Sequence, residues 1–148
     1  MKPVLQALVL ADRVYRDAVS GKRVIAGTFT HFFFSKTPAY KEVEQPDGTK
    51  RRLLAGGLQV GSPWAYLSLT DVVDGTKLLL QFVNIGNQQQ LFSTEITLSC
   101  KDRLVTVEVE LPLPMLPIDA KGTYAFEVMC DGEPLGSYRI VADEVTIT

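Results

Sequence analysis

Hydrophobic and polar residues alternate with a period of two along most of this chain. The segment Arg103–Leu111 reads R-L-V-T-V-E-V-E-L, and Ser93–Cys100 and Thr123–Cys130 repeat the same alternation. Successive side chains of a β-strand point to opposite faces, so each segment predicts a strand with one face on a core and the other in water. No long segment has a helical period with a cap. The pattern therefore predicts an all-β protein.

Further strands are expected where β-branched and aromatic residues cluster between turn signals. Two of these segments, Val4–Val14 and Lys77–Val83, have apolar residues at both odd and even positions and so on both faces of the strand, which favours central positions in a sheet. The last strand is predicted from Tyr138–Val141 and Val145–Thr148, with a bend at Ala142-Asp143. The remaining predicted strands are Arg23–Phe29, Ala39–Val43, Leu54–Val60 and Trp64–Val72.

Asp-Gly pairs punctuate the chain at Asp47-Gly48, Asp74-Gly75 and Asp131-Gly132, and Ser20-Gly21-Lys22 is a similar signal. Asp tolerates a positive φ and Gly adopts it freely, so these pairs predict hairpin turns. The segment Pro112–Pro117 cannot pair inside a sheet and is expected to cross between sheets. About nine or ten strands without helices predict a single domain, residues 1–148, folded as an antiparallel two-sheet β-sandwich with Greek-key order.

Two parts of the chain carry a resemblance to known proteins. One is Leu8-Val9-Leu10-Ala11-Asp12 followed by Gly21-Lys22 and Ile25-Ala26-Gly27-Thr28-Phe29; the other is Gly122–Val128 followed by Asp131-Gly132. Together they resemble a family of small bacterial β-sandwich proteins of uncharacterised function, and the expected strand order resembles C2-like and immunoglobulin-like sandwiches. The family often has Cys where this chain has Ala11. The resemblance implies a fold and no activity.

The charge balance argues against binding to nucleic acid. The formal net charge is −2 and the isoelectric point is about 5.4, whereas nucleic-acid-binding domains are usually basic. The basic run Lys50-Arg51-Arg52 is interpreted as a solvated hairpin arm. No apolar run approaches the roughly 18 residues of a membrane-spanning helix, and Val4–Ala11 lacks a signal-peptide cleavage site. We therefore expect a cytoplasmic protein without a transmembrane segment.

Residues with catalytic or metal-binding chemistry are few. His31 is the only histidine and lies in an aromatic stretch, where it is expected to pack against rings. Cys100 and Cys130 lack zinc or redox spacing and are expected to be free thiols, although a bridge between predicted strands stays open. No catalytic residue, cofactor or metal ligand is predicted. An enzyme with a site assembled from distant residues is a remaining alternative.

Calcium needs only oxygen ligands, so a calcium-dependent module that binds a membrane or a carbohydrate is another alternative. Its ligands would come from Asp71, Asp74, Asp119 and Asp131 at strand ends, although turn geometry already accounts for the aspartates in Asp-Gly pairs. The loop Asn84–Gln90 carries five amides and is a second place where a sugar could bind.

Asp12 shares its parity with Leu8, Leu10 and Val14, so its carboxylate is expected to point toward the core and to need a partner. The candidates for that partner are Arg13, Arg16, Lys22, Arg23 and backbone N–H groups.

Two apolar connections are the candidate functional surfaces. An extended Phe32-Phe33-Phe34 places rings on both sides of the backbone, and Pro114-Met115-Leu116 lies in the proline-rich crossover. Loops normally run over the surface, and an exposed apolar patch marks an interaction site. Packing into the core is the favoured interpretation of both segments. If part of either is exposed, we expect a non-catalytic binding domain that docks a protein partner or a copy of itself through these residues.

Overall fold

The computed structural model describes residues 2–34, 40–54, 62–118 and 120–145. Its regular elements in these ranges are β-strands, and no helix there has the length and hydrophobicity needed to cross a membrane. The strands are β1 (Val4–Arg16), β2 (Arg23–Thr28), β3 (His31–Phe34), β4 (Tyr40–Glu44), β5 (Lys50–Leu54), β6 (Trp64–Thr70), β7 (Lys77–Asn84), β8 (Gln89–Thr97), β9 (Val107–Pro112), β10 (Gly122–Cys130) and β11 (Glu133–Glu144).

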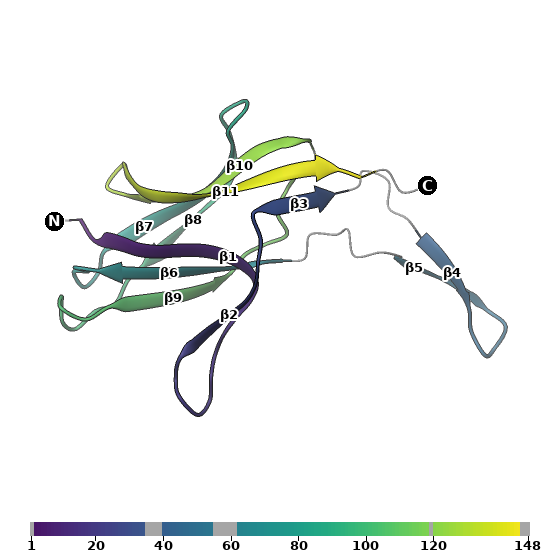
Figure 1. The fold of residues 1–148 in the computed structure, drawn as a ribbon, viewed down its shortest axis with the longest axis horizontal. Coiled ribbons are helices and arrows are strands. Elements are labelled where there is room, and N and C mark those ends of the chain that lie inside the picture. Colours follow the sequence, from purple (N-terminus) through teal and green to yellow (C-terminus); the bar gives the residue numbers. More distant parts are fainter. Residues whose placement is uncertain (1, 35–39, 55–61, 119, 146–148) are drawn as a thin grey trace.

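Nine of the strands form two sheets that face each other as a sandwich (Figure 1). The first sheet has the order β2-β1-β6-β9 and the second the order β3-β11-β10-β7-β8, while β4 and β5 form a separate two-stranded sheet. The predicted all-β two-sheet architecture is confirmed. Pairing is antiparallel as predicted except at one edge of the second sheet, where β3 runs parallel to β11.

The core lies between the two sheets. Inward residues of the first sheet are in register across its strands, with Leu8 opposite Leu67 and Leu10 opposite Ala65. In the second sheet the ring of Phe82 stacks on Phe92 and on Tyr124, with centroid separations of 5.5 and 5.6 Å. Period-two alternation puts these side chains on one face of each strand, and burying that face is the main drive for the sheets to pack.

The predicted central strands and crossover are confirmed. β1 lies between β2 and β6, and β7 lies between β10 and β8. Pro112 is the last residue of β9 and pairs with Trp64 at the edge of the first sheet, and the residues that follow it link β9 to β10 of the second sheet. Along one side of the sandwich β1 also contacts β11, where a Cβ on Gly136 would lie 2.7 Å from Leu5 Cδ2.

The Asp-Gly pairs form three different connections. Asp131 and Gly132 have φ values of 52° and 78° and make the expected two-residue hairpin between β10 and β11. Gly48 has a φ of 85° in the hairpin that joins β4 to β5. The hairpin prediction for Asp74-Gly75 is wrong: β6 and β7 belong to different sheets, and the pair sits in a crossover. A glycine allows a local turn, but it does not choose which strand the chain pairs with next.

Ser20-Gly21-Lys22 lies in the connection of the predicted β1–β2 hairpin, and Lys50-Arg51-Arg52 lies on the β5 arm of the β4–β5 hairpin. β9 begins only at Val107, because Asp102 turns the preceding residues: its side chain accepts a hydrogen bond from Leu104 N, and its carbonyl accepts one from Val105 N. β11 continues through Ala142-Asp143 to Glu144, so the strand is not interrupted where the bend was predicted.

Two other predicted strands cannot be compared fully. Most of Leu54–Val60 and most of Val145–Thr148 lie outside the described residues.

Asp12 does not point into the core, contrary to expectation. Asp12 is exposed, and its carboxylate lies beside Gly27. A Cβ added to Gly27 would be 2.5 Å from Asp12 Oδ2. Gly27 has a φ of 76°, so the strand opposite Asp12 departs from extended geometry and the parity rule fails here. An exposed carboxylate needs no buried ionic partner.

Candidate functional site

The Phe32–Phe34 segment is strand β3, at the edge of the second sheet next to β11. Phe32 and Phe34 face inward and are buried in the core, at 9% and 4% exposure, whereas Phe33 is 50% exposed. Of the candidate interaction residues in this segment, only Phe33 is therefore available to a partner. Burial of the other two follows from alternation on a strand packed over a core.

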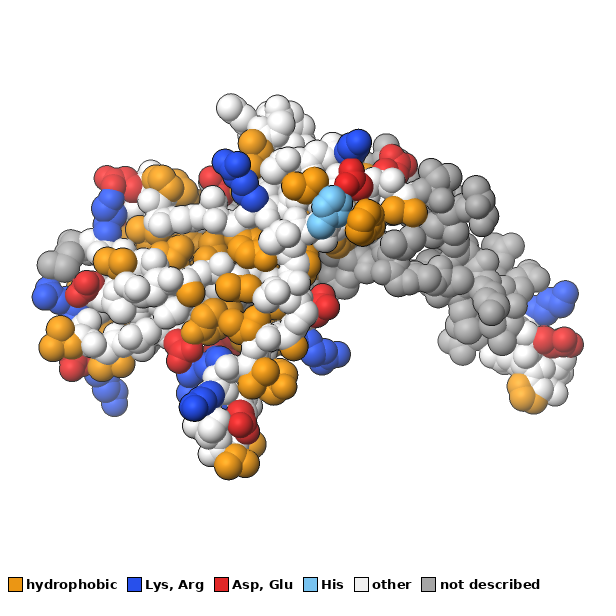
Figure 2. Space-filling model, viewed as in Figure 1, with side chains coloured by type: hydrophobic (Ala, Val, Ile, Leu, Met, Phe, Trp, Pro, Cys, Tyr) orange, Lys and Arg blue, Asp and Glu red, His pale blue; other side chains and the backbone are white. Residues whose placement is uncertain are grey.

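Phe33 belongs to a small surface that we call the β3–β11 strip, made of His31, Phe33, Val141 and Asp143. Residues paired in register share a face, and the pairs here are His31 with Val141 and Phe33 with Asp143. Val141 is 41% exposed. In Figure 2 the single histidine of the chain lies among hydrophobic side chains with acidic groups beside it.

His31 holds this strip together by two contacts. Its ring lies 4.8 Å from the ring of Phe33, and its Nε2 lies 2.7 Å from Asp143 Oδ2. Lys121 Nζ lies 3.8 Å from the other carboxylate oxygen of Asp143. His31 packs against aromatic rings as expected, but its side chain is 47% exposed. The ring contact with His31 restrains Phe33, and the interaction with Asp143 restrains His31.

The proline-rich crossover also has both buried and exposed residues. Leu113 and Leu116 are buried, at 4% and 3% exposure, and Leu113 N donates to the Pro63 carbonyl. Pro114 is exposed and Met115 is 60% exposed. Of the candidate residues in this segment, Leu116 is therefore core, while Pro114 and Met115 are accessible.

The outer face of the first sheet carries a charged network that the sequence analysis did not single out. Arg23 Nε lies 3.1 Å from Glu110 Oε2, and Arg23 Nη1 lies 3.3 Å from Glu108 Oε1. The Tyr66 hydroxyl donates to Glu108 Oε2 at 2.5 Å. The network joins β2, β6 and β9 over the face opposite the core. Its signal in the sequence is the alternation of β9, where Glu108 and Glu110 alternate with partly buried valines that pack against the core.

The side chains of the network are only partly exposed to water, and the pKa values of two of them are shifted. Side-chain exposure is 19% for Arg23, 33% for Glu108 and 29% for Glu110. The hydrogen bond to Glu110 raises the pKa of Arg23, and burial together with the bond to Glu108 raises the pKa of Tyr66. Arg23 therefore stays a cation and Tyr66 a neutral hydrogen-bond donor at neutral pH.

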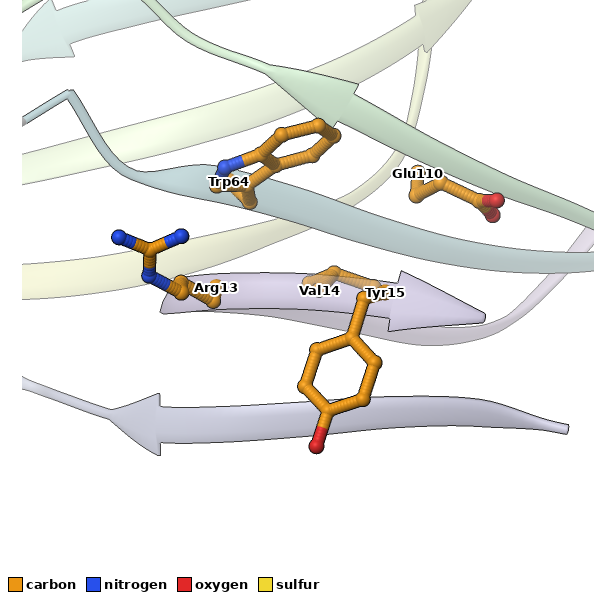
Figure 3. A pocket seen from close by; sticks show the side chains of 5 residues that line it. All are labelled: Arg13, Val14, Tyr15, Trp64 and Glu110. Atoms are coloured by element: carbon orange, nitrogen blue, oxygen red, sulfur yellow. The ribbon is translucent and has the colours of Figure 1, made fainter. Parts of the chain in front are cut away.

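Beside this network lies a hollow of about 540 Å³, lined by Arg13, Val14, Tyr15, Trp64 and Glu110 (Figure 3). We call it the Trp64 hollow. Val14 is buried at 3% exposure, although it is not part of the main core, and Tyr15 is 52% exposed. Figure 3 shows Trp64 on β6, Glu110 on β9 and Tyr15 reaching over β2. Strands distant in sequence thus supply an aromatic, a basic and an acidic group to one place.

A second hollow, of about 390 Å³, is formed by the amide-rich loop after β7. Its polar lining comes from Asn84, Gln88 and Gln90 together with Gln81 and Glu127. Asn84 Oδ1 accepts from Gly86 N, so part of the polar lining is used within the loop. No aromatic side chain lines this hollow among the described residues. His31 lines neither of the two hollows.

The aspartates considered for calcium have separate roles where they are described. Asp71 Oδ1 lies 3.8 Å from Arg103 Nε, Asp74 Oδ1 accepts from Cys100 N, and Asp131 forms the β10–β11 turn. Asp119 lies outside the described residues. Within the described ranges no three His, Cys, Asp or Glu side chains are grouped in a way that would hold a metal ion.

Both cysteines are free thiols. Cys130 is buried, and burial raises its pKa, with the Asp131 carboxylate adding to the effect. Cys100 is partly exposed, and its thiol donates to the Asp102 carbonyl at 3.0 Å. The two thiols therefore differ in access and, for Cys130, in the ease of forming the reactive thiolate.

Thiol titration should show this difference. In denatured, unreduced protein we expect two reactive thiols per chain, and in native protein at pH 8 one fast and one slow reaction with a thiol reagent. Cys130→Ala should remove the slow phase and Cys100→Ala the fast one. Zero reactive thiols after denaturation would instead indicate a Cys100–Cys130 bridge.

Comparison of the chain with models of protein families and with curated protein sequences gave no match. The resemblance to a bacterial sandwich family therefore stays an expectation, and the surfaces described above are the basis for any functional assignment.

Proposed function

We propose that this chain is a non-catalytic binding domain that docks a protein partner through the β3–β11 strip. The observation that carries the proposal is the half-exposed ring of Phe33, held in place on an edge strand by His31. In this proposal the domain works in the bacterial cytoplasm, where reducing conditions keep both cysteines as thiols.

The exposed ring of Phe33 has a contact that restrains it before any partner arrives. His31 contacts Phe33 and is itself held by Asp143 at 2.7 Å. Ordering a flexible side chain at an interface costs about 0.5–1.5 kcal/mol, and a ring that is fixed beforehand avoids much of this cost. A rigid aromatic group on the surface is therefore well suited to fill a pocket on a partner.

The surroundings of Phe33 also fit a docking site. Val141 extends the apolar surface, while Asp143 and Lys121 place charges beside it. An apolar centre with a polar rim is the usual arrangement of a protein interface. β3 is only four residues long, so it offers few backbone groups to an added strand, and side-chain contacts are expected to dominate.

Site-specific crosslinking tests this function. A photo-crosslinking phenylalanine analogue at position 33 should capture a discrete protein in native extract, whereas the same analogue at position 104 should not, although Leu104 is 84% exposed. The captured protein would then be purified, and its affinity measured for the wild type, Phe33→Asp and Leu104→Asp.

We expect Phe33→Asp to abolish binding, and Leu104→Asp to bind like the wild type, with neither change shifting the melting temperature by more than a few degrees. Equal binding of the two variants would show that the β3–β11 strip is not the docking surface. Crosslinking to a second copy of the chain would instead indicate self-association.

A further inference from the structure

We propose that the Trp64 hollow is a second binding site, independent of the β3–β11 strip, and that it takes a neutral saccharide. The hollow brings together residues from β1, β6 and β9 on the side of the first sheet away from the core (Figure 3). Its volume of about 540 Å³ falls within the range of small-molecule sites, which is roughly 300–1,000 Å³.

The charges around the hollow balance. Arg13 and Glu110 line the hollow and Arg23 and Glu108 complete the network, so these four side chains carry two positive and two negative charges. A charged ligand would add a charge to this balanced group, whereas a neutral ligand would leave the Arg23 network intact. The network thus favours neutral ligands.

The free polar groups favour hydroxyls. Arg13 is exposed and makes no ion pair within the described part of the chain, so its guanidinium N–H groups are available as donors. Glu110 accepts from Arg23 through Oε2, and an ionised carboxylate has further lone pairs that can accept. A hydroxyl can accept from Arg13 and donate to Glu110, so neighbouring hydroxyls on one molecule can use both.

The apolar part of the hollow favours a ring with a flat C–H face. Tyr15 is 52% exposed, Trp64 is partly exposed, and Val14 is the aliphatic residue of the lining. Aromatic faces bury apolar surface readily and keep their shape because they have few rotatable bonds. A pyranose has a C–H face that can lie on such a ring and hydroxyls around its edge, and it therefore matches both parts of the hollow.

The test uses the fluorescence of Trp64, which is the only tryptophan in the chain. Neutral oligosaccharides of glucose, xylose, mannose and N-acetylglucosamine would be titrated into the 148-residue chain, with calorimetry in parallel. We expect at least one to change the emission in a saturable way. An open-chain sugar alcohol, which has hydroxyls without the flat ring face, should not do so.

The variants then locate the site. Tyr15→Ala and Arg13→Ala should each weaken the calorimetric affinity by about tenfold, the equivalent of one good contact. Val19→Ala, on the same hairpin and 96% exposed, should bind like the wild type. Unchanged melting temperatures would show that the loss is local.

Three results would overturn the proposal. The first is that none of these sugars changes the emission. The second is that Tyr15→Ala and Arg13→Ala both bind like the wild type. The third is that binding is lost instead in Gln88→Ala, which would place the site in the hollow at the amide-rich loop after β7. The β3–β11 strip is tested separately by Phe33→Asp, so that failure of one site does not decide the other.

Discussion

Leu116→Asp is expected to unfold the domain, whereas Met115→Asp, one residue earlier, should leave the melting temperature almost unchanged. Leu116 is 3% exposed and belongs to the core, while Met115 is 60% exposed. A buried carboxylate without a partner costs several kcal/mol. Domains are typically stable by only about 5–15 kcal/mol, so this cost removes a large share of the free energy of unfolding. Thermal unfolding followed by circular dichroism measures both variants.

The pair of variants also checks how the proline-rich crossover sits on the sandwich. If Met115→Asp destabilised the domain as much as Leu116→Asp, the segment would pack with both side chains inward. If neither did, the crossover would not cover the core at all. Pro114 is exposed as well, and Pro114→Ala gives a control that changes the backbone without adding charge.

Phe82→Ala is expected to lower the free energy of unfolding by about 3–5 kcal/mol, the usual cost of removing a buried aromatic ring. Phe82 is fully buried and stacks on both Phe92 and Tyr124, so its loss leaves a cavity beside both rings. Urea denaturation at equilibrium gives the difference.

Phe33→Ala is the matched control, since it removes the same atoms from a side chain that is 50% exposed. We expect it to change the free energy of unfolding by less than about 1 kcal/mol, because a half-exposed ring loses little buried area. Similar losses in both variants would contradict the placement of Phe33 on the surface.

Local features of the sequence predicted much of the fold. Alternation in Thr123–Cys130 gave a strand with its buried face assigned, and the Asp131-Gly132 pair gave a hairpin with the expected positive φ values. The prolines after β9 predicted a crossover, which the structure shows. These features depend on the chain's own stereochemistry and on the period of its side chains, and both can be read without knowing the neighbours.

The sites were only partly predictable. An extended Phe32-Phe33-Phe34 must place rings on both sides, but which side faces the core depends on how β3 pairs with β11, far away in the chain. The prediction that Asp12 points toward the core failed for a similar reason, because the positive φ of Gly27 on the partner strand changes the local geometry. Asp74-Gly75 is a turn signal for a hairpin and for a crossover alike. It lies in a crossover because the next strand, β7, joins the other sheet.

By itself, the sequence determined that the chain is an all-β sandwich, where most of its strands lie and which segment crosses between the sheets. Only the tertiary structure decided that Phe33 is exposed while Phe32 and Phe34 are core, and that Arg23 reaches Glu108 and Glu110. Arg23 and Glu110 are 87 residues apart, and such contacts arise when strands from distant segments become neighbours in one sheet. Strand order depends on the summed burial of all strands together, which no local pattern encodes.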